Sequence, residues 1–120
     1  MPVVDLEQVT RMLGDPEVTR QLVERVLLDL PRYRSQLAEA TAVADWLQVA
    51  RVAHVLGGCV SNVNAARTST AARQLEHAIK DGDLTRVTAL AGRLASAAAD
   101  LTGVLDDWCR KAPRTGGAAA

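Results

Sequence analysis

A helical spacing of apolar residues recurs along the chain and constrains its fold more than any other feature of the sequence. No stretch shows the sustained two-residue alternation of β-branched or aromatic side chains that a half-buried strand requires. In the clearest segment, steps of three and four residues separate Trp46, Val49, Ala53, Leu56, Val60 and Val63. This spacing is typical of a helix that packs one face into a bundle, so the sequence predicts an all-α fold.

Stop and start signals divide the pattern into one short helix and four long ones. Asp5 is the expected N-cap of the first helix, and Gly14 ends it. Asp15 and Pro16 begin the second helix, and Asp45 caps the third. The expected ranges are 5–13, 16–42, 46–63, 65–80 and 84–111. Because the connections are short, we expect an antiparallel up-down-up-down four-helix bundle with a short N-terminal helix.

Further expectations concern the helix interiors and the end of the chain. Pro31 lies inside the second helix and predicts a kink without a break, because the apolar spacing continues past it. Val18 and Leu84 begin the apolar faces of the second and last helices, so both are expected in the core. Trp46 and Trp108 are expected to anchor the core ends. One domain then spans residues 1–111, and residues 112–120 form a flexible tail.

Charge and composition exclude several classes of protein. Fourteen basic and fourteen acidic side chains leave a net charge of zero, which argues against a nucleic-acid binder. No apolar run approaches the roughly 18 residues that a membrane span requires, and the N-terminus lacks the features of a signal peptide. Motifs for ATP binding, serine hydrolysis and zinc proteolysis are missing from the sequence. We therefore expect a cytoplasmic protein that contacts neither nucleic acid nor membrane.

The cysteines and histidines show none of the spacings of a metal or redox site. Cys59 and Cys109 lie far apart in the sequence, and Cys59 is expected to pack between helices. His77 lies away from the apolar face of its helix, so we expect it to be solvated. A zinc site would need ligands scattered over several helices. The sequence therefore predicts no metal and no cofactor.

His54 lies on the solvent side of the third expected helix, about 120° from the middle of its apolar face. One turn later the surface carries no side chain at Gly58, which forms a glycine pair with Gly57. Each of these glycines costs about 1 kcal/mol relative to alanine inside a helix. Such a pair indicates a kink, close helix packing, or access for another molecule. On periodicity alone, His54 is an ordinary surface histidine; alternatively it is a nucleophile, because a neutral imidazole can attack phosphorus. The same side of the helix holds Arg51, Gly58, Ser61 and Asn62.

The residues around His54 resemble the signature of histidine-containing phosphotransfer (HPt) domains, which is roughly A-H-x-L-K-G-S/A, small residues, and N-[LIV]-G-A. Here residues 53–65 read AHVLGGCVSNVNA. Residues 72–83, ARQLEHAIKDGD, are similar to the family's second marker, a leucine-glutamate pair followed by a Gly-Asp turn. The run into the histidine and the start of the chain are also similar to the family. The resemblance spans about residues 4–110 and implies the four-helix bundle fold.

The resemblance implies that His54 accepts a phosphoryl group through Nε2 from the aspartate of a receiver domain and passes it to a second receiver. Mg²⁺ and most catalytic groups would belong to the receiver, so no independent catalysis is expected of this domain, which we expect to be a monomer. The chain fits a free-standing protein or the cytoplasmic C-terminal end of a hybrid sensor histidine kinase. The residues expected around the phosphosite and in receiver docking are Arg51, Val55, Gly57, Gly58, Ser61 and Asn62.

Three positions depart from the family pattern. Gly57 stands where lysine is usual, Cys59 stands where serine or alanine is common, and Asn64 replaces a frequent glycine. Loss of the lysine charge weakens the stabilisation of a phosphoryl group or leaves it to Arg51. A non-catalytic HPt-like module that docks on a receiver or kinase without carrying phosphate is therefore an alternative. A generic helical dimerisation domain is a third hypothesis.

Overall fold

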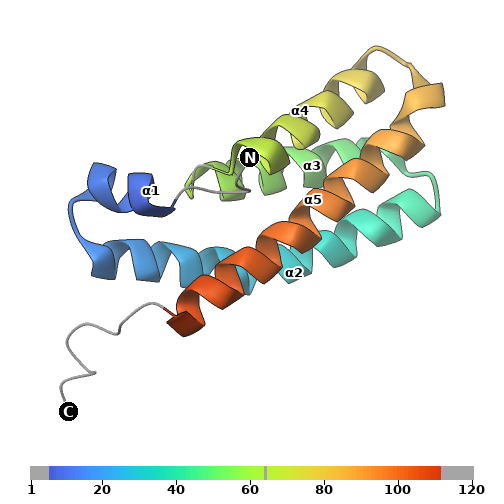
Figure 1. The fold of residues 1–120 in the computed structure, drawn as a ribbon. Helices are drawn as coiled ribbons and strands as arrows, with labels where there is room; N and C mark the ends of the chain where they lie inside the picture. Colours follow the sequence, from blue (N-terminus) through green and yellow to red (C-terminus); the bar gives the residue numbers. More distant parts are fainter. Residues whose placement is uncertain (1–5, 64, 112–120) are drawn as a thin grey trace.

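The structure, a computed structural model, describes residues 6–63 and 65–111, and it contains five helices and no strand within them (Figure 1). The all-α prediction is confirmed, and each expected helix boundary agrees to within two residues. Three expectations lie outside the described residues. They concern the cap at Asp5, the departure from the family pattern at Asn64, and the tail 112–120. The helices are α1 (Leu6–Leu13), α2 (Pro16–Ala42), α3 (Trp46–Ser61), α4 (Ala66–Lys80) and α5 (Leu84–Lys111).

Local signals set the ends of these helices. The backbone N–H of Glu17 donates to Asp15 Oδ1 over 2.8 Å at the start of α2, so the predicted cap is confirmed. The predicted cap of α3 is also confirmed, because Asp45 Oδ1 accepts a hydrogen bond from the backbone N–H of Gln48 over 3.2 Å. Ala44, just before that cap, has a φ of 55°, in the left-handed region that favours glycine.

The four long helices pack in a closed ring. α3 contacts α2 and α4, and α5 contacts α4 and α2, whereas α1 packs on α2. Figure 1 shows the first part of α2 and the last part of α5 continuing past the ends of α3 and α4. The core runs along the inside of the ring, and its largest fully buried side chains include Leu30, Leu37, Leu56, Leu75, Leu94, Leu101 and Leu105. Each long helix contributes at least one leucine, as the apolar spacing predicts.

Two residues expected in the core lie on the surface. Val18 is 42% exposed and Leu84 is 52% exposed, so these two predictions are wrong. Both occupy the first turn of a helix, and the buried residues of α2 and α5 begin only after them, at Thr19 and Val87. The first turns of α2 bury Thr19 and Arg20 instead of Val18. α2 continues through Pro31 without a break, as predicted.

A buried arginine joins the extended parts of α2 and α5. Arg20 is only 8% exposed, and its guanidinium lies 5.8 Å from the ring centroid of Trp108. Its Nη2 donates to the carbonyl oxygen of Cys109 over 3.4 Å. Trp108 and Trp46 both pack against the core, so their predicted place at the core ends is confirmed. None of the described helices is both long and apolar enough to cross a membrane.

Candidate functional site

The His54 side chain stands in the middle of α3 and is 79% exposed. Ala53, just before His54, and Leu56, two residues after it, are fully buried. The helix backbone beneath the imidazole is therefore fixed by the core while the ring itself faces solvent. The exposure that the helical spacing predicts for His54 is confirmed.

A carboxylate from the adjacent helix contacts the ring. Glu76 of α4 places its Oε2 3.2 Å from Nδ1 of His54, and the Glu76 side chain is 28% exposed. When Nδ1 carries the proton, it donates to this carboxylate, and Nε2 keeps its lone pair. The contact thus favours the tautomer in which the far nitrogen is available as a nucleophile or acceptor.

Sequence reasoning did not identify Glu76 as the partner of His54, although it noted the leucine-glutamate pair. Leu75 is fully buried, so the next residue of α4 lies at the edge of the core. The 22 residues between His54 and Glu76 are brought together only by the packing of α3 on α4. The sequence did contain one usable signal. Glu76 directly follows a core leucine, so its side chain can reach α3 if α3 and α4 are taken to be neighbours.

Most of the expected site residues lie on the same exposed surface of α3. The Val55 side chain is 47% exposed, and Ser61 Oγ donates to the carbonyl oxygen of Gly58 over 2.9 Å. Leu47, which was not expected here, lies two turns before His54 and is 64% exposed. We call this set the His54 surface, and its members are Leu47, Arg51, His54, Val55, Gly58, Ser61 and Asn62.

Gly57 and Gly58 differ in what an added side chain would meet. A Cβ added at Gly57 would meet the Cβ of Ala72 in α4 at 3.2 Å, tighter than an ordinary contact. A Cβ added at Gly58 would have nothing within 4 Å. Of the reasons that a glycine pair allows, close helix packing therefore applies to Gly57 and open access to Gly58. Gly57 therefore faces α4, and its expected place around the phosphosite and in receiver docking stays a prediction.

The charges near His54 differ from the family pattern, in which a lysine usually stands where this chain has Gly57. Within residues 6–63 and 65–111, no carboxylate lies within ion-pair distance of Arg51, which leaves its cation available.

Cys59 packs against the core, as predicted. Burial raises the pKa of the Cys59 thiol, and Asp29 raises it further. Cys59 is therefore a poor nucleophile at neutral pH.

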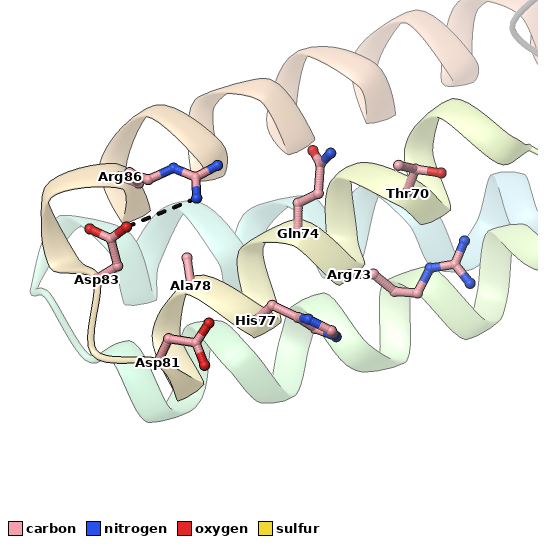
Figure 2. A pocket seen from close by; sticks show the side chains of 8 residues that line it. All are labelled: Thr70, Arg73, Gln74, His77, Ala78, Asp81, Asp83 and Arg86. Carbon is pink, nitrogen blue, oxygen red and sulfur yellow. Dashed lines mark ion pairs between the residues drawn. The ribbon is translucent and has the colours of Figure 1, made fainter.

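A hollow lies between the end of α4 and the start of α5, with a volume of about 400 Å³ (Figure 2). Its lining includes Arg73, His77, Asp81 and Arg86, and Arg86 pairs with Asp83 over 3.9 Å. This lining mixes both signs of charge, so it favours neither anions nor cations. His77 is exposed there, as predicted. In the described part of the chain, no three His, Cys, Asp or Glu side chains cluster closely enough to hold a metal ion.

Comparisons with known proteins agree with this geometry. The model of the Hpt domain family matches residues 21–115. The crystal structure of histidine-containing phosphotransfer protein B from Pseudomonas aeruginosa PAO1 is similar, with a TM-score of 0.78 and 20% sequence identity. That similarity covers 93% of this chain and 98% of the other, and at this identity it shows the shared fold. No curated protein matches the chain. Since the family match spans most of the sequence, the chain belongs to the Hpt domain family.

Proposed function

We propose that this domain is a phosphorelay intermediate, in which His54 accepts a phosphoryl group from a receiver-domain aspartate and passes it to another receiver. The observation that carries the proposal is the exposed His54 imidazole, whose Nδ1 lies 3.2 Å from Glu76 in a chain of the Hpt domain family. Membership of this family supports a role in phosphotransfer. No nucleotide site and no cofactor of its own are required, and Mg²⁺ is expected on the receiver.

The chemistry follows from the tautomer that Glu76 favours. The Nε2 lone pair attacks the phosphorus of the aspartyl phosphate in line, so the N–P bond forms as the P–O bond breaks. The aspartate leaves as a carboxylate, and the imidazole becomes cationic because Nδ1 keeps its proton. The Glu76 carboxylate stabilises that cation through the hydrogen bond to Nδ1. Transfer to the second receiver reverses these bond changes.

The receiver would dock on the His54 surface. Gly58 leaves space beside the imidazole, and the exposed apolar side chains of Leu47 and Val55 provide area to bury. Arg51 offers a cation to the phosphoryl group or to acidic residues of the receiver. We further propose that the four long helices alternate in direction as an antiparallel bundle and that the domain is a cytoplasmic monomer. It would act alone or at the C-terminal end of a hybrid sensor histidine kinase.

A second candidate function is a docking module that binds a receiver or kinase without carrying phosphate. Gly57 favours this alternative because it provides no lysine beside His54, and the side chain that contacts the imidazole is the carboxylate of Glu76. A phosphoryl group on Nε2 would then depend on Arg51 and the receiver for its charge stabilisation.

Phosphotransfer from a phosphorylated receiver domain separates the two candidates. The relay predicts an acid-labile, base-stable label on the wild type that disappears with His54→Gln. The matched control is His77→Gln, which removes the other exposed histidine and should leave the label unchanged. A wild type that binds the receiver but takes up no label would establish the docking module instead.

A further inference from the structure

We infer that Gly57 is a positioning residue, because its missing side chain lets α4 lie close enough for Glu76 to hold the imidazole of His54. The inference rests on the proposed role of His54 as phosphoryl acceptor. Against the family pattern, Gly57 is only the loss of a lysine. The inference gives the glycine a positive role in the site.

Two contacts between α3 and α4 are neighbours along both helices. Gly57 lies three residues after His54 on α3, and Ala72 lies four residues before Glu76 on α4. At 1.5 Å of rise per residue, each separation is about one helical turn. The close contact at Gly57 therefore sets the distance between the helices one turn away from the hydrogen bond between His54 and Glu76.

The alanine at this contact has no room to yield. Ala72 is fully buried beside Leu75, and a methyl group has no alternative rotamer that would relieve a clash. A Cβ at position 57 would lie 3.2 Å from the Cβ of Ala72, so the two helices must separate by a few tenths of an ångström. Packed interiors transmit such shifts because they contain few voids that could absorb them.

The hydrogen bond at His54 is sensitive to a shift of this size. The separation of 3.2 Å between Nδ1 and Glu76 Oε2 is already at the long end of the range for N–H···O bonds. A further separation weakens the bond, and the proton then redistributes from Nδ1 to Nε2. Because Nε2 with a proton has no lone pair, Gly57 controls the fraction of His54 that is ready to attack phosphorus.

The test measures the imidazole tautomer directly, by ¹⁵N NMR of the whole chain at about two pH units above the ordinary titration of histidine. We expect mainly the Nδ1-protonated form in the wild type. Glu76→Ala gives the ratio of the two tautomers when no carboxylate contacts the ring. Gly57→Val should move the ratio of tautomers about threefold toward that value, as expected for a weakened hydrogen bond, and Gly57→Ala should move it less. His77 is the internal reference.

Gly58→Ala is the matched control, because the same methyl group one residue later meets open space and should leave the His54 tautomer unchanged. Ala72→Gly added to Gly57→Ala should restore the wild-type ratio, because it removes the atom that the new methyl group meets. This pair also keeps the test valid if Gly57→Val does not fold. The inference is wrong if Gly57→Ala leaves the ratio unchanged, or if Ala72→Gly does not restore it.

The proposed function and this inference can fail separately. The tautomer measurement uses no phosphate donor, so it reports on positioning even if the wild type takes up no label. A wild type that accepts phosphate, together with Gly57 variants that leave the tautomer unchanged, would overturn the inference and leave the relay function in place.

Discussion

His54 and His77 are both exposed histidines, but they differ in what lies beside the ring. His54 contacts a carboxylate through Nδ1, whereas His77 stands on the rim of an open hollow of mixed charge. The difference arises from one turn of α4, where Glu76 faces α3 and His77 faces outward. At the scale of single residues, the neighbour of the ring therefore distinguishes a candidate phosphosite from an ordinary surface histidine.

Glu76→Gln tests this distinction in the transfer reaction. The amide keeps the shape of the side chain but removes the negative charge that stabilises the cationic imidazole. Hydrogen bonds to charged groups contribute about 1.5–3 kcal/mol, so we expect the transfer rate to fall about tenfold. Rapid-quench labelling from a phosphorylated receiver measures the rate. Glu39→Gln, at an exposed position elsewhere on α2, is the control, and equal rates for the two variants would contradict the role of Glu76.

Cys59 makes a second prediction at this scale. Burial raises the pKa of its thiol, so the native state keeps the proton to higher pH than the unfolded chain does. The free energy of unfolding should therefore fall as the pH rises above about 8.5, the ordinary thiol value. Urea unfolding at a series of pH values measures the slope. Cys59→Ala should reduce that slope, and a remainder should persist from Cys109, whose thiol pKa burial also raises.

At the scale of helices and turns, the boundaries follow from local chemistry. Asp15 and Asp45 hold the first backbone N–H groups of α2 and α3, and Gly14 and Gly82 adopt the positive φ that ends α1 and α4. In the connection between α2 and α3, one residue adopts a backbone conformation that is unfavourable for its type. Ala44 has a φ of 55°, which costs about 1–2 kcal/mol for a residue with a Cβ.

Ala44→Gly should therefore stabilise the protein. Glycine accepts the left-handed conformation, but it also gives the unfolded chain more freedom, so we expect a net gain of about 0.5–1 kcal/mol in the free energy of unfolding. Gly82→Ala, at a φ of 73°, is the reverse change and should be destabilising. Urea denaturation of the three proteins measures both effects. A loss of stability in Ala44→Gly would show that the turn is not strained.

Glycines inside helices give a further prediction. A Cβ at Gly92 of α5 would have nothing within 4 Å, so Gly92→Ala should raise the free energy of unfolding by about 1 kcal/mol. Gly57→Ala should gain less, because part of that increase is lost to the contact with Ala72. Urea midpoints for the two variants make the comparison. An equal gain at both positions would show that α3 and α4 separate without cost.

These elements also show what the sequence could predict and what it could not. Caps, left-handed glycines and apolar spacing act within a few residues, so the five helices were predicted to within two residues. The side chains of Val18 and Leu84 fit the spacing but are exposed, because the buried faces of α2 and α5 begin one or a few residues later. The exposure of His54 followed from its own helix, whereas its contact with Glu76 required the packing of two helices.

For the whole molecule, the buried Arg20 joins the two longest helices at the end that α3 and α4 do not reach. Arg20→Ala would remove the contact with Trp108 and the hydrogen bond to the Cys109 carbonyl, and leave a void among partly buried side chains. We expect the free energy of unfolding to fall by about 2 kcal/mol. Thermal unfolding measures this loss. Arg25→Ala is the matched control at an exposed position of α2, and it should have a much smaller effect.

The exposure of His54 also bears on how long a signal can last. With 79% of its side chain open to solvent, this ring would give a bound phosphoryl group no shelter from water. On the proposed function, hydrolysis then competes with delivery from the moment of loading. The lifetime of the phosphorylated domain would be set by hydrolysis and by the supply of the acceptor together, so phosphorylation would decline soon after the donor stops supplying it.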